Sequence, residues 1–219
     1  MPETNQNAVE KTVKTWQIIV AVIAAAVLWF FLFSPSAQFL DFWVMLPLAA
    51  GLLSVWAIIC GGLPVTREQF QLKAIGIGAV AALMLYVIFF VGNFSANLLF
   101  GFASDQVNSI YAMKSSDGSM LWIALMLLFV SSPGEEIFWR GFLQKWAIGK
   151  WGNVAGWLAT ALLYAAVHIV SGNFILVMAA FVAGLFWGLM AAWLKGNLLP
   201  VIISHSLWTF GIFVLWPIR

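Results

Sequence analysis

The chain has 219 residues, of which 63% are hydrophobic and only 8% are charged, and its formal net charge at pH 7 is +2. Soluble domains carry about a quarter charged residues, so this composition excludes an ordinary soluble globular protein. The few basic residues form no patch with interleaved aromatic residues, which argues against nucleic acid as a partner. We therefore predict an all-α polytopic membrane helix bundle whose immediate partner is membrane lipid.

Uncharged runs long enough to cross a bilayer recur along the chain. They divide it into a polar tail at residues 1–15 and a single bundle at residues 16–219. We expect about seven membrane-spanning helices, at residues 16–33, 42–60, 74–91, 120–147, 153–170, 174–194 and 198–216. A cleaved signal peptide is the competing interpretation of the first run, but its length favours a retained helix.

The connections predict how the bundle is oriented. Residues 92–119 form the longest polar connection, and Pro133-Gly134 should kink the fourth helix or make it re-entrant. One set of alternate connections holds Lys11, Lys14, Arg67, Lys73, Lys145, Lys150 and Lys195, and the other holds only Lys114 and Arg219. By the positive-inside rule, the amino terminus is cytoplasmic and the carboxyl terminus lies outside.

Residues 131–144 concentrate ionisable side chains inside an apolar helix, where each charge costs roughly 2.5–3.5 kcal/mol on insertion scales. Glu136 and Arg140 are four residues apart, so we expect an ion pair on one helix face. Glu135 is rotated by about 100° from Glu136 and is free to face another group. One glutamate held by an arginine beside a second, free one suits a general base.

Both histidines of the chain, His168 and His205, fall in expected membrane helices. Either one alone is most simply a buried core residue, but with Glu135 they form a set of two imidazoles and one carboxylate. This set could bind Zn²⁺ with an open position for water. It could equally act without a metal, with the carboxylate activating water and the imidazoles orienting it or stabilising the oxyanion. A small proton-coupled transporter is a third alternative.

Helical spacing adds two supporting residues. Tyr164 lies four residues before His168 and could orient its imidazole, while Thr209 lies four residues after His205 and offers a hydroxyl donor to the same pocket. Ordinary packing is the alternative for both residues.

Two further patterns predict packing rather than chemistry. Gly184 and Gly188 form a small-xxx-small pair, which is typical of close contact between membrane helices. The 13 tryptophans are predicted to anchor the helices at the membrane interface.

Three motifs together resemble those of the CPBP family, which comprises the CAAX prenyl endopeptidases and bacterial relatives linked to bacteriocin processing and self-immunity. The motifs are Glu135-Glu136-x-x-x-Arg140, Tyr164-x-x-x-His168 and Gly196-Asn-Leu-Leu-Pro-Val-Ile-Ile-Ser-His205, within a protease-like core at residues 118–215. The resemblance implies an intramembrane endopeptidase of the bacterial plasma membrane. Its substrate would be a peptide or lipoprotein, cleaved in a membrane-presented or lipidated carboxyl-terminal segment.

The resemblance also implies residue roles. Glu135 would activate the water, with Glu136 and Arg140 supporting it. His168 would help to position the water and His205 would help to stabilise the oxyanion. Both metal-dependent and metal-free mechanisms are argued for the family, so Zn²⁺ stays an open alternative.

The sequence departs from the family pattern at Tyr164, where Phe is usual, and at Thr209, where Asn or Asp is usual. A hydroxyl donates one hydrogen bond but has neither the donor geometry of an amide nor the charge of a carboxylate. Losing one oxyanion donor typically costs about 10²–10³ in turnover. The alternative function is therefore a catalytically weak immunity or interaction protein on the same scaffold.

Overall fold

The computed structural model describes residues 12–34, 41–112 and 119–219, and the secondary structure in these residues is entirely helical, which confirms the all-α class. Most of the predicted tail at residues 1–15 lies outside the described residues. The α-helices are α1 (Thr15–Phe33), α2 (Phe42–Gly61), α3 (Leu72–Leu99), α4 (Ala103–Ala112), α5 (Met120–Met126), α6 (Ser132–Glu136), α7 (Lys145–Trp151), α8 (Asn153–Ala166), α9 (Phe174–Trp193) and α10 (Leu199–Phe210). Short 3₁₀ turns occur at Arg67–Gln69 and Ile169–Ser171, and π-helical segments at Leu127–Ser131, Ile137–Gln144 and Gly211–Leu215.

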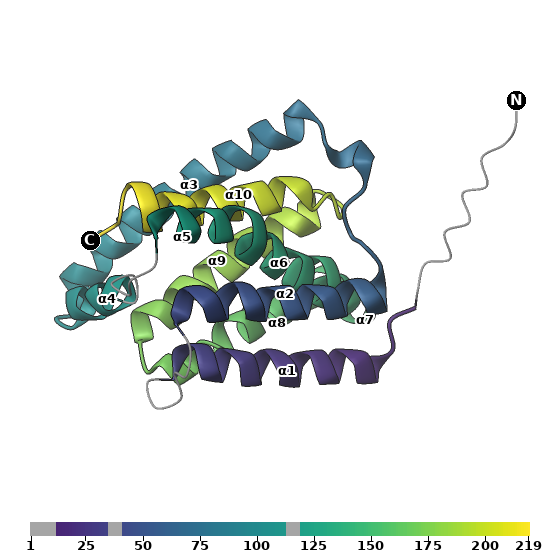
Figure 1. The fold of residues 1–219 in the computed structure, drawn as a ribbon, viewed down its shortest axis with the longest axis horizontal. Coiled ribbons are helices and arrows are strands. Elements are labelled where there is room, and N and C mark those ends of the chain that lie inside the picture. The colour runs from purple at the N-terminus through teal and green to yellow at the C-terminus, as the bar shows by residue number, and fades with distance from the viewer. Residues whose placement is uncertain (1–11, 35–40, 113–118) are drawn as a thin grey trace, which may run out of the picture.

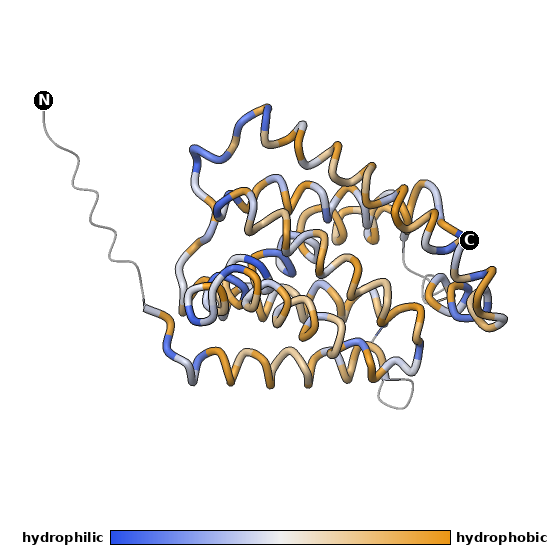
Figure 2. Tube along the Cα trace, turned by 180° about the vertical axis from the view of Figure 1, so that it is seen from behind, coloured by the Kyte–Doolittle hydropathy of each residue, from blue (hydrophilic) through white to orange (hydrophobic). Residues whose placement is uncertain are grey.

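The membrane-spanning character of the bundle is confirmed. In the described part of the chain, six helical segments are long and apolar enough to cross a membrane, and a shorter apolar helix at Leu199–Leu215 makes a seventh. Figure 2 shows helices that are mostly hydrophobic along their length, with polar stretches concentrated towards the ends of the bundle.

The helix that carries the two glutamates lies at the centre of the bundle (Figure 1). α6 contacts α2 on one side and α10 on the other, while α3 packs against the far side of α10. α8 packs between α7 and α9, and α1 lies alongside α2. Side chains of α6 are therefore surrounded by other helices rather than by lipid.

Two connections differ from the prediction. The third helix continues beyond residue 91 to Leu99, and α4 follows it, so 92–119 is not simply a polar loop. Asn97 donates a hydrogen bond to the backbone carbonyl of Asn93 one turn earlier, which accommodates polar residues inside the helix. The connection that was expected to hold Lys145 and Lys150 is a turn at Gly152 (φ +83), a backbone conformation that glycine adopts readily, and both lysines lie in α7.

The fourth helix passes Pro133 without interruption and runs continuously from Met120 to Trp151. Proline lacks the backbone N–H that an α-helix interior uses. Here π-helical segments precede and follow the short α6, and such segments change the helical register and are frequent at functional sites. Glu135 and Glu136 end the α-helical stretch between them.

Gly134 allows α6 to approach α2 closely. A Cβ atom at residue 134 would lie 2.9 Å from the carbonyl oxygen and 3.1 Å from the carbonyl carbon of Ala50, and these backbone atoms cannot rotate away. We expect Gly134→Ala to lower the free energy of unfolding in detergent by about 1–3 kcal/mol. Gly51→Ala is the matched control, because a Cβ there has nothing within 4 Å, and it should preserve or slightly raise stability. Equal losses in both variants would contradict this account.

Candidate active site

Glu136 and Arg140 form the ion pair that their spacing predicts. Nη1 of Arg140 lies 2.9 Å from Oε1 of Glu136, and the two side chains are 1% and 0% exposed. The same carboxylate oxygen lies 2.7 Å from Nδ1 of His205, which ties α10 to α6. Because a carboxylate only accepts hydrogen bonds, Nδ1 of His205 carries the hydrogen.

Glu135 faces α8 rather than Arg140. The hydroxyl of Tyr164 donates a hydrogen bond of 2.8 Å to Oε2 of Glu135, and both side chains are buried. The guanidinium carbon of Arg140 lies 4.7 Å from the centroid of the Tyr164 ring. Tyr164 therefore contacts one glutamate directly, and the cation that neutralises the other glutamate packs on its face.

His168 lies within the apolar segment Asn153–Ser171, which is long enough to cross a membrane, as predicted, in the turn between α8 and the 3₁₀ segment Ile169–Ser171. Its Nδ1 is 2.7 Å from the backbone carbonyl oxygen of Tyr164, and its Nε2 accepts a 3.2 Å hydrogen bond from the indole N–H of Trp29. Both ring nitrogens are thus bonded to protein groups. These bonds link His168 to Glu135 through Tyr164.

Zn²⁺ bound by Glu135, His168 and His205 does not fit this arrangement. An imidazole needs an unprotonated ring nitrogen with a free lone pair to bind a metal. In His168 one nitrogen carries a hydrogen and the other accepts from Trp29. Across residues 12–34, 41–112 and 119–219, no three His, Cys, Asp or Glu side chains are grouped so as to hold an ion. These three side chains, as arranged, are not a ligand set.

Thr209 lies one turn after His205, as its spacing predicts, but its hydroxyl serves its own helix. It donates a 2.8 Å hydrogen bond to the backbone carbonyl of His205. Its oxygen also lies 3.5 Å from the hydroxyl of Ser132, at the limit for a hydrogen bond. The Thr209 hydroxyl was expected to donate a hydrogen bond towards the site around His205. Its hydrogen is instead bonded to the backbone of its own helix.

Several tryptophans pack in the core, so the prediction that all of them anchor the membrane interface is wrong. Four tryptophan side chains are at most 1% exposed, namely Trp29, Trp43, Trp139 and Trp187. The Trp187 ring stacks on the His205 imidazole, with centroids 3.8 Å apart and planes 21° apart. A buried tryptophan N–H usually has a hydrogen-bond partner, and that of Trp187 donates to the hydroxyl of Ser204 at 3.2 Å.

Gly184 and Gly188, which flank Trp187 in α9, are the sequence feature that could have indicated its buried position. A Cβ on Gly184 would lie 3.3 Å from Ala161 and from the Tyr164 ring, and one on Gly188 would lie 2.7 Å from Trp157. This confirms the predicted close packing, which brings α9 against α8 and lets Trp187 reach the site. No comparable local signal marks Trp29.

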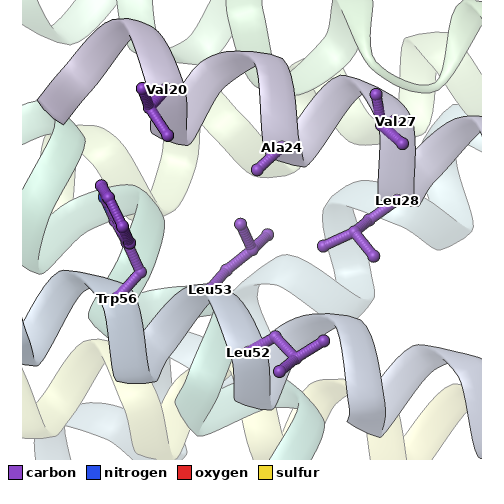
Figure 3. Close-up of a pocket in the computed structure, with 7 residues that line it drawn as sticks. All are labelled: Val20, Ala24, Val27, Leu28, Leu52, Leu53 and Trp56. Atoms are coloured by element: carbon purple, nitrogen blue, oxygen red, sulfur yellow. The ribbon is translucent and has the colours of Figure 1, made fainter. Parts of the chain in front are cut away.

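An apolar groove of about 340 Å³ opens between α1 and α2 (Figure 3). Its lining consists of Val20, Ala24, Val27, Leu28, Leu52, Leu53 and Trp56. None of the predicted site residues lines this groove, so the chemistry has to be sought in the network around Glu135.

The comparisons with known proteins give a family match for part of the chain. No curated protein and no solved structure matches the chain. Residues 117–211 match the family model of the type II CAAX prenyl endopeptidase Rce1-like proteins, and this segment contains every predicted site residue from Glu135 to Thr209. The match supports the resemblance to the CPBP family that the three motifs indicated. Over residues 117–211, somewhat under half of the chain, the protein is similar to the type II CAAX prenyl endopeptidase Rce1-like family.

Proposed function

We propose that the protein is an intramembrane endopeptidase that hydrolyses a peptide bond in a membrane-presented peptide or lipidated carboxyl-terminal segment, with Glu135 activating the water. The family match supports a membrane protease in general. The observation that carries the assignment of the base is the different environment of the two adjacent glutamates. Arg140 and His205 hold Glu136, whereas the side-chain hydrogen bond to Glu135 comes from the neutral phenol of Tyr164.

In this mechanism, Glu135 removes a proton from water while the water oxygen attacks the carbonyl carbon of the scissile amide. The electron pair of the C=O double bond moves onto the oxygen, and donors near that oxygen stabilise its charge. His205 can donate from Nε2 in its doubly protonated form, with its Nδ1–H on Glu136. Glu135 then passes its proton to the amide nitrogen as the C–N bond breaks.

His168 supports the base indirectly in this arrangement. Its Nδ1–H holds the carbonyl of Tyr164, and the Tyr164 hydroxyl holds Glu135. Direct contact between His168 and the water would require Nε2 to exchange Trp29 for the water, because the nitrogen has one lone pair.

Tyr164→Phe should lower kcat about tenfold without unfolding the protein, because a hydrogen bond to a charged group is worth about 1.5–3 kcal/mol. The substitution removes the hydroxyl that orients Glu135 and keeps the ring on which Arg140 packs. Tyr86→Phe is the control, since the Tyr86 hydroxyl donates to the exposed backbone of Trp216. An unchanged kcat in Tyr164→Phe would show that the phenol does not position the base.

Cleavage itself can be tested with purified protein in liposomes. A peptide with a farnesylated cysteine four residues from its carboxyl terminus is the first probe, and the same peptide without the lipid and one with a diacylglyceryl cysteine are the others. We expect mass spectrometry to detect a released carboxyl-terminal fragment from at least one of them. If all three peptides stay intact, the peptidase proposal fails.

Thr209 favours a second candidate, a catalytically weak immunity or interaction protein. Its hydroxyl hydrogen is bonded to the carbonyl of His205, so the third motif supplies no donor from this position. A protein of this kind would protect its host cell against a bacteriocin or bind a partner without turnover. Protection that persists in a Glu135→Gln variant would support this candidate over the peptidase.

A further inference from the structure

The first helix, outside the matched segment, supplies a hydrogen bond to the site. The indole N–H of Trp29 in α1 donates to Nε2 of His168 over 3.2 Å, and the two side chains are 1% and 6% exposed. The backbone carbonyl of Tyr164 at the other nitrogen can only accept, so Nδ1 carries the ring hydrogen. An indole N–H can only donate a hydrogen bond, and Nε2 of His168, which then carries no hydrogen, can accept it. The two partners together select one neutral tautomer.

The backbone of His168 is not part of a regular helix. α8 ends at Ala166, and the chain turns through His168 into the 3₁₀ segment Ile169–Ser171, which is followed by Gly172 with a positive φ of 64°. The imidazole is instead enclosed by aromatic rings. The centroid distances from its ring are 5.0 Å to Phe33, 5.2 Å to Tyr164 and 6.1 Å to Trp29.

Trp29 is itself held in place. Its ring meets that of Trp139 edge-on, with centroids 6.0 Å apart, and Trp139 packs in the same way on Tyr164 at 5.1 Å. Trp29, Trp139, Tyr164 and His168 therefore form a closed group of rings from α1, the fourth helix and the end of α8. This group borders the phenol that binds Glu135.

We propose that Trp29 is a positioning residue of the site, whose indole N–H fixes the tautomer and orientation of His168 and through them the position of Tyr164 against Glu135. Without the indole donor, a neutral imidazole can move its hydrogen to Nε2, and the bond from Nδ1 to Tyr164 is then lost. α1 thereby completes a site whose other residues lie in the matched segment. The effect on catalysis rests on the proposed peptidase function, whereas the hydrogen bond can be tested without it.

The test uses the only two histidines of the chain. Full-length protein labelled with ¹⁵N-histidine, purified with a histidine-free tag, should show His168 as the neutral Nδ1–H tautomer. A His205→Asn variant assigns the signals. Trp29→Phe should shift the Nε2 resonance of His168 or mix its tautomers. Trp43→Phe is the matched control, because Trp43 is equally buried and its indole nitrogen has no hydrogen-bond partner among the described residues. A His168 spectrum unchanged in Trp29→Phe would overturn the proposal.

If Trp29→Phe does not fold, the bond is tested from its other end. In ¹⁵N-tryptophan-labelled protein, His168→Ala should move the resonance of one buried indole more than the other twelve. Thirteen indole resonances that all keep their positions would overturn the proposal.

Turnover of the peptide that the wild-type protein cleaves tests the positioning role. We expect Trp29→Phe to lower kcat about tenfold, and to lower it no further in a His168→Ala background, because the two residues act as one unit. Full turnover in Trp29→Phe, or losses that multiply in the double variant, would overturn the role. A wild-type protein that cleaves no peptide would count against the proposed function, and the spectra would still decide on the hydrogen bond.

Discussion

Glu135→Gln should abolish peptide-bond cleavage and leave the fold intact. Glutamine has nearly the same shape and its side-chain oxygen can still accept the hydrogen bond from Tyr164, but it cannot take a proton from water. General-base catalysis contributes typically 10²–10⁴-fold, so we expect kcat to fall by at least about 10²-fold. The measurement is release of the peptide fragment by protein in liposomes, with the thermal unfolding temperature as the check on folding.

Glu68→Gln makes the same chemical change on an exposed carboxylate of the loop between α2 and α3, and it should keep the full rate. If Glu135→Gln retained the rate of the Glu68 variant, Glu135 would not be the base, and the assignment of the water-activating residue would fail. Loss of the rate together with loss of the folded protein would show that Glu135 is needed for the structure.

The parts of this site that follow from short-range geometry could be predicted from the sequence. Residues four apart on a helix meet on one face, and this places Arg140 on Glu136 whatever the rest of the bundle does. The membrane-spanning helices could also be predicted from local sequence, since a sufficiently long apolar run indicates such a helix. Helix ends were predicted less well, because polar side chains such as Asn97 bond back to their own helix.

The contacts between helices could not be predicted. Tyr164 is 29 residues from Glu135, His205 is 69 residues from Glu136, and Trp29 is 139 residues from His168. Which side chains meet over such separations depends on how each helix is rotated about its axis. One inserted residue rotates all later side chains by about 100°, and the π-helical segments before and after α6 alter the register in this way.

Arg140→Leu should destabilise the protein by about 3–5 kcal/mol, because it leaves the Glu136 carboxylate buried without its cation. Glu136 is fully buried, and its Oε2 has no hydrogen-bond partner among the described residues. Contact with water therefore cannot compensate the carboxylate for the loss of the Arg140 guanidinium. Unfolding in detergent, followed by circular dichroism, measures the change. Arg67→Leu, on an exposed arginine, is the control and should change stability little.

The double variant Glu136→Gln/Arg140→Leu separates the buried charge from the packing of the arginine. Both variants lose the contacts of the guanidinium with Tyr164 and Trp187, but only the single variant keeps an uncompensated carboxylate. We therefore expect the double variant to be more stable than Arg140→Leu alone, since removing both partners of a buried pair costs much less than removing one. If the two variants were equally unstable, the loss of stability in Arg140→Leu would come from lost packing. The ion pair with Arg140 would then not be the reason why Glu136 can be buried next to Glu135.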